Sequence, residues 1–156
     1  FITSNLITKI DLQRIAFDFD IYFQIFNRQV FALSVNGREL RGPSFENSDL
    51  FRLGGTSTLR GYREEQFLGS RIFWSNIEYR FLLTRRTFAF AFFDTGYYLR
   101  NAEPERNILK SEDFLYGYGL GLNLETGLGV LAVSFALGQG DSFIDGKIHF
   151  GLVNEF

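Results

Sequence analysis

Apolar and polar side chains alternate along most of this chain, so that every second residue has the same character. The clearest stretch is 12–26. There Phe17 and Phe19 fall on one parity, while Asp18 and Asp20 fall on the other. Successive side chains of a β-strand point to opposite faces, so this stretch predicts a strand with one apolar and one charged face. Its length is about what a tilted strand needs to cross a bilayer.

Similar alternation recurs along the rest of the chain. The predicted strands are 12–26, 29–37, 70–83, 87–99, 114–125, 128–137 and 144–156, and residues 1–8 are a candidate end of an eighth. Short turns (27–28, 84–86, 126–127) alternate with longer loops (41–69, 100–111, 138–143). Short turns on one side and long loops on the other are typical of outer-membrane barrels. The predicted fold class is therefore all-β, an antiparallel transmembrane β-barrel with about seven or eight visible strands.

Composition supports this interpretation. Aromatic residues make up 18% of the chain, with 20 Phe, yet 22% of the residues are charged and the mean hydropathy is −0.02. A barrel that is apolar outside and polar inside needs this mixture. The longest unbroken apolar run, 88–93, is far too short for a membrane-spanning helix. The 156 residues predict one domain, 1–156.

Several kinds of chemistry are excluded or disfavoured. The chain has no cysteine, which excludes disulfides and thiolate metal sites. The net charge of −2 gives no sign of a nucleic-acid surface. His149 is the sole histidine, and no serine-histidine-acid arrangement is legible, so we predict no enzyme, cofactor or metal site. The first residues lack a signal-peptide pattern, which indicates either a removed signal peptide or an internal piece of a longer chain.

The loop 41–69 is the most informative segment. Loops of this length in compact proteins are usually functional or disordered, and this one contains glycine and apolar residues that disorder would not need. Its candidate functional motif consists of Gly54, Gly55, Leu59, Arg60, Gly61 and Tyr62. We expect a buried arginine working inside the barrel.

Further segments follow this motif in a specific order. They are Gly69-Ser70, Asn76-Ile77-Glu78-Tyr79-Arg80, Phe93-Asp94-Thr95-Gly96, the glycine-rich 117–121 and a closing Phe156. Over roughly 29–156 this set resembles the C-terminal half of the barrel of BamA-type outer-membrane assembly factors. That superfamily includes TamA, the two-partner secretion transporters, and mitochondrial and chloroplast relatives. The family barrel has sixteen strands, and the motif loop is its sixth extracellular loop, folded back into the lumen.

The resemblance implies that Arg60 points inward and meets Glu78 and Asp94. The alternation independently places Glu78 on the polar face of its strand. An arginine can bind two carboxylates at once with planar geometry that lysine lacks. Asp94 shares its parity with three phenylalanines (Phe88, Phe90, Phe92), which makes that inner face less polar than expected. Leu59 stands where the family often has valine.

Two other interpretations of these charges stay open. Arg60, Glu78 and Asp94 could be separate solvated charges in a polar lumen, or the triad could stabilise the loop without an active role. The chain's last residues, with Phe150, Gly151, Leu152 and Phe156, resemble the C-terminal assembly signal of outer-membrane barrels. The alternative there is an ordinary edge strand. In the family the last strand pairs weakly with the first and forms a lateral seam, and that first strand has no counterpart in this sequence.

The resemblance implies an outer-membrane barrel, Gram-negative rather than organellar, that inserts or translocates proteins. Its implied partners are the lipid bilayer, unfolded outer-membrane protein clients, accessory lipoproteins and POTRA domains, and no POTRA domain is present in 1–156. The alternative is a small self-contained barrel of about eight strands with a structural or partner-binding role. A third interpretation, a soluble lipid-binding barrel, would need the apolar parity inside and would leave the Arg60 loop unexplained. The sequence does not distinguish an insertase from a secretion pore.

Overall fold

The computed structural model describes residues 12–43 and 45–153. Their strands are β1 (Gln13–Phe26), β2 (Gln29–Arg41), β3 (Phe51–Leu53), β4 (Phe67–Gly69), β5 (Arg71–Leu82), β6 (Phe88–Arg100), β7 (Ser111–Thr126), β8 (Gly129–Gly138) and β9 (Lys147–Val153). Two short 3₁₀ turns, η1 (Pro104–Arg106) and η2 (Phe143–Asp145), complete the elements. No helix in these residues is long and apolar enough to cross a membrane.

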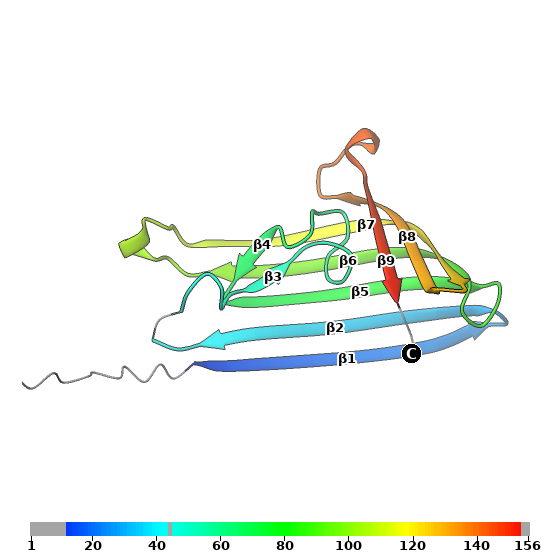
Figure 1. The fold of residues 1–156 in the computed structure, drawn as a ribbon, viewed down its shortest axis with the longest axis horizontal. Helices are drawn as coiled ribbons and strands as arrows, with labels where there is room; N and C mark the ends of the chain where they lie inside the picture. Colours follow the sequence, from blue (N-terminus) through cyan, green and yellow to red (C-terminus); the bar gives the residue numbers. More distant parts are fainter. Residues whose placement is uncertain (1–11, 44, 154–156) are drawn as a thin grey trace, which may run out of the picture.

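Seven strands form one antiparallel sheet in the order β1-β2-β5-β6-β7-β8-β9 (Figure 1). The prediction of an antiparallel all-β fold is confirmed. The sheet is not closed: β1 and β9 are its two edges, and within residues 12–43 and 45–153 they pair with β2 and β8 alone. A closed small barrel is therefore not what these residues form. The candidate eighth strand, 1–8, lies outside the described residues.

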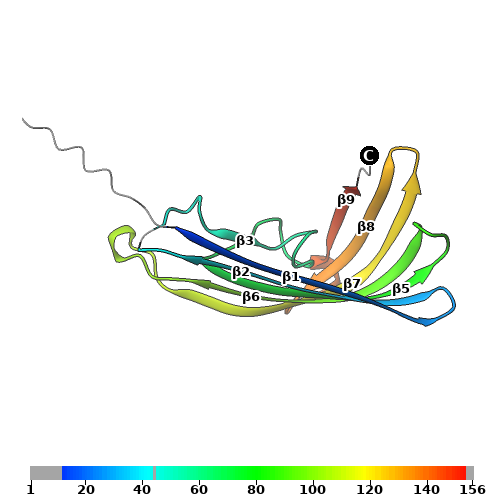
Figure 2. The ribbon, with the colours of Figure 1, turned by 90° about the horizontal axis from the view of Figure 1, so that it is seen from below.

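The two faces of the sheet differ in chemistry, as the alternation predicted. Large apolar side chains are exposed on the convex face, among them Phe73, Phe81, Phe93, Leu120, Leu122, Ile148, Phe150 and Leu152. The opposite parity holds the buried polar groups Asn36, Asp94, Ser134 and His149. Figure 2 shows the curvature of the sheet, with the segment that contains β3 on its concave side. This is the arrangement of a barrel wall, apolar toward lipid and polar toward the lumen.

The loop 41–69 contains a small hairpin that the sequence did not predict. Strands β3 and β4 pair from Phe51 opposite Gly69 to Leu53 opposite Phe67. Leu53 is fully buried and packs with residues of the loop and the wall, namely Leu59, Tyr62, Ile72, Trp74 and Leu115. A local hydrophobic core thus fixes the loop against the inner wall before any charged group is considered.

Candidate functional site

The motif begins with a turn that only glycine tolerates well. Gly54 and Gly55 have φ values of +117° and +97°, a region that side chains rarely adopt. The Gly54 amide donates to the Thr58 hydroxyl at 2.9 Å, and the Gly55 amide donates to the Leu59 carbonyl at 3.0 Å. A Cβ atom on Gly55 would lie 2.0 Å from the Glu64 carboxylate. The two glycines therefore close the turn and leave room for the returning chain.

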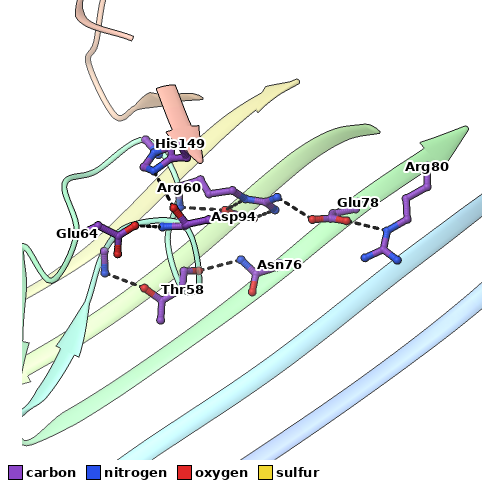
Figure 3. Close-up of polar contacts among 11 residues, drawn as sticks. Thr58, Arg60, Glu64, Asn76, Glu78, Arg80, Asp94 and His149 are labelled. Atoms are coloured by element: carbon purple, nitrogen blue, oxygen red, sulfur yellow. Dashed lines mark hydrogen bonds and ion pairs between the residues drawn. The ribbon is translucent and has the colours of Figure 1, made fainter. Parts of the chain in front are cut away.

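Arg60 lies at the end of this turn with its side chain 8% exposed. Its Nε and Nη2 donate to the two oxygens of Asp94 on β6, at 2.7 Å and 2.8 Å. Its Nη1 donates to Glu78 on β5 at 2.7 Å. The structure thus brings together the three residues that the resemblance connected, as Figure 3 shows. They form a buried, directly hydrogen-bonded network, which contradicts the interpretation as separate solvated charges.

Two neighbouring aromatic rings of β6, Phe90 and Phe92, lie beside this charge on the lumen face. The Arg60 guanidinium carbon lies 3.7 Å from the ring centroid of Phe92 and 5.6 Å from that of Phe90. A cation over an aromatic face is favourable, most of all where water is excluded. The phenylalanines that share the parity of Asp94 are therefore part of the arginine site. Burial opposes the charge, but hydrogen bonds and the carboxylates of Asp94 and Glu78 outweigh it, so the pKa of Arg60 lies above its ordinary value.

The neighbouring motif residues attach the loop to other strands. Gly61 has φ +94°, and a Cβ there would lie 2.7 Å from the Leu137 carbonyl of β8. The Tyr62 hydroxyl donates to the Tyr116 carbonyl of β7 at 3.0 Å and accepts from the Gln139 amide at 3.1 Å. Three consecutive residues thus contact different strands of the wall.

His149 is a site residue that sequence reasoning did not select. Its ring is buried on the inner face of β9, and its Nε2 accepts a hydrogen bond from the Gly61 amide at 3.1 Å (Figure 3). The available signal was its parity, which is opposite to that of the outward-facing Ile148 and Phe150. That parity predicts a lumen position but gives no indication that the motif loop reaches β9.

The comparison with protein families agrees with this geometry. The Omp85 superfamily domain matches residues 4–156, almost the whole chain. The chain belongs to the Omp85 superfamily. No curated protein matches it. Omp85 proteins are outer-membrane proteins of bacteria and organelles, and they are non-enzymatic factors that insert or translocate proteins.

The predicted C-terminal signal is described in part. In this Omp85 chain Phe150 and Leu152 are exposed on the outer face of β9, and Gly151 is half-buried on the inner face. Phe156 lies outside the described residues. The alternation of the segment is therefore present in the described part of β9, and its reading as an assembly signal stays a prediction.

Proposed function

We propose that this Omp85 chain forms the C-terminal wall of a BamA-like barrel in the outer membrane of a Gram-negative bacterium, where it inserts outer-membrane proteins. The mechanism is physical: an unpaired strand edge offers backbone groups to an incoming client strand. The lumen loop holds the wall in the competent shape. The partners are the bilayer, unfolded barrel clients, and accessory lipoproteins and POTRA domains outside residues 1–156.

The observation that carries this proposal is the character of β9. Within residues 12–43 and 45–153 it pairs with β8 at 7 positions, whereas β6 and β7 pair at 13, and its other edge has no strand partner there. An exposed strand edge is normally protected in soluble proteins because it recruits other strands. A short edge strand with a short partner interface is also the easiest to separate or to extend. Secretion of a passenger through the lumen, the other activity of the superfamily, is not favoured by a specific contact.

Crosslinking to a stalled client tests the proposal. The chain has no native cysteine, so Leu152→Cys places a unique thiol on β9. Phe93→Cys is the matched control, because Phe93 is also outward-facing but lies on β6 between two paired strands. With a client that has a single cysteine in its terminal strand and with an added thiol oxidant, we expect disulfide capture by Leu152→Cys and none by Phe93→Cys. Equal capture by the two variants, or capture by neither, would overturn edge pairing as the mechanism.

A further inference from the structure

The inner face of β9 is in direct contact with the motif loop at His149. The Nε2 atom accepts from the Gly61 amide at 3.1 Å, and the Nδ1 atom lies 3.5 Å from the Thr56 hydroxyl. One step along the same face, a Cβ on Gly151 would lie 3.4 Å from the Thr56 methyl carbon. Within the described residues, the side-chain hydrogen bonds between β9 and the loop both end on the imidazole.

The Gly61 contact fixes the protonation state of His149. A backbone amide can only donate, so Nε2 has to be unprotonated in order to accept. The ring is then neutral with its proton on Nδ1, where it can be donated to the Thr56 hydroxyl. Protonation of Nε2 would place an N–H against an N–H, and the contact would be lost.

The contact between Gly61 and His149 connects β9 with a distant strand of the same sheet, β6. The Arg60 amide donates to Asp94 of β6 at 3.1 Å, while the next amide, that of Gly61, donates to His149 of β9. In the sheet, β7 and β8 lie between these two strands. Two adjacent peptide groups therefore connect the buried arginine site with the edge strand, and any displacement of β9 acts directly on the residue that follows Arg60.

We infer that His149 is a positioning residue that couples the edge strand β9 to the motif loop through its neutral imidazole, and that protonation of the ring uncouples them. The inference rests on the proposed function for its consequence, since β9 is there the edge that receives a client. In the coupled state the loop holds β9 in place. In the uncoupled state β9 and the loop move independently, which frees the edge strand under acidic conditions.

Glu78 and Arg80 of β5 line the same cavity as the imidazole. Four further charged groups act on the ring and come from three elements. Arg60 and Glu64 belong to the loop, Asp94 to β6 and Lys147 to β9 itself. Two of these groups are cationic and two are anionic. Glu64 and Asp94 are both engaged, Glu64 by the Thr56 amide at 2.6 Å and Asp94 by Arg60. Within this cluster, the protonation of the imidazole decides whether the Gly61 amide has an acceptor.

Nitrogen NMR of the complete protein in lipid vesicles tests the protonation state. His149 is the one histidine of residues 1–156, and in a ¹⁵N-histidine-labelled protein its pair of ring signals is identified as the pair that His149→Gln removes. We expect at neutral pH an unprotonated Nε2 and a protonated Nδ1, and a doubly protonated ring on acidification. The opposite tautomer, or a charged ring at neutral pH, would overturn the inference.

A spin label on the loop tests the coupling. Ser57 is exposed at the loop tip, so Ser57→Cys accepts a label without entering the contact. We expect label mobility to rise severalfold as the ring is protonated, with the same midpoint as the NMR titration. His149→Gln keeps an acceptor that does not titrate, so its label should stay immobile at every pH, whereas His149→Ala should be mobile at every pH. The coupling would be contradicted if label mobility with His149 present did not change as the ring is protonated, or if it changed with pH in His149→Gln.

The two proposals fail separately. If crosslinking of clients to β9 fails while the label and the ring titrate together, the coupling stands and the insertion mechanism falls. If clients are captured but the label does not respond to the ring, the insertion mechanism stands and the role of His149 falls.

Discussion

Arg60 uses three nitrogens on two carboxylates that come from neighbouring strands, and this geometry explains why the residue is arginine. A lysine ammonium is a single point charge and cannot hold the planar contact to Asp94 while also reaching Glu78. Asp94 is fully buried. Removing one partner of a buried ion pair strands the other charge, at a cost of about 3–5 kcal/mol. Truncating Arg60 or Asp94 should therefore be destabilising, even where the intact ion pair adds little to the free energy of unfolding.

Arg60→Ala should therefore release the motif loop. The buried Asp94 carboxylate then loses its arginine partner, whereas Glu78 keeps its ion pair with Arg80, and the anchored state loses about 3–5 kcal/mol relative to the open state. Cleavage by a glutamate-specific protease after the exposed Glu64 and Glu65 should rise about 100-fold or more, because cleavage follows the population of the open loop. Arg60→Lys keeps the charge without the fork and should give an intermediate rate.

Heat-modifiable migration on gels is the control that the barrel itself stays folded in both variants. Cleavage of Arg60→Ala at the wild-type rate would show that the apolar core around Leu53 and Leu59 holds the loop alone. In that case the charged triad would not anchor it.

The residues of the site differ in how well the sequence could place them. Glu78 was predictable because its polar parity alternates with the outward-facing Tyr79. Asp94 follows Phe90 and Phe92 on one parity, so alternation alone describes an apolar inner face there. The rings are inside because a cation lies over them, and this tertiary contact has no local sequence signal. His149 required knowledge of which strand the loop would reach.

At the level of strands, β6 and β7 fit together through rings and glycines. Phe90 lies opposite Gly121 and Phe92 opposite Gly119, and a Cβ on either glycine would meet the facing ring at 2.8 Å or less. Gly117 lies opposite Asp94, and a Cβ there would lie 1.9 Å from the Arg60 carbonyl oxygen. The glycine face of β7 is therefore the space that the Arg60 site occupies.

Gly117→Ala should displace the motif loop although it touches no charged side chain. The clash is with backbone, which cannot rotate away, so we expect a cost of about 1–3 kcal/mol to the docked loop. Protease cleavage of the loop should rise about fivefold or more. Gly127→Ala is the matched control, since nothing lies within 4 Å of a Cβ at that turn. Equal cleavage of the two variants would rule out close packing at Gly117.

The strands were predicted well where apolar and polar side chains alternate, and less well at their polar ends. β2 was expected to end at Gly37 but continues to Arg41, because Glu39 there pairs with Arg71 of β5 and backbone pairing persists without an apolar face. β7 begins at Ser111 rather than Phe114 for a similar reason, since its first residues are polar and still pair with β6. β9 begins at Lys147, because the 3₁₀ turn η2 occupies 143–145.

As a whole, the molecule is a curved, open wall with its polar chemistry on the concave side. Exposed large apolar side chains occur on β1, β5, β6, β7 and β9, so they extend over most of the main sheet. Patches of that extent are unfavourable in water but are what a bilayer solvates. An exposed apolar side chain should therefore face lipid when it lies on a strand and water when it lies in a loop.

Substitutions at two leucines distinguish these two environments. Leu120 is 66% exposed near the middle of β7, and Leu109 is 83% exposed in the loop before it. In lipid vesicles Leu120→Arg should lower the free energy of unfolding by about 2–4 kcal/mol, because it places a charge against the hydrocarbon. Leu109→Arg should change it by no more than about 0.5 kcal/mol, because that side chain meets water. Denaturant titration of the two variants measures both values. A small effect at Leu120, or equal effects at both sites, would mean that protein or water covers the convex face. Contact with lipid would then no longer explain why apolar residues, many of them Phe, alternate with polar ones along the chain.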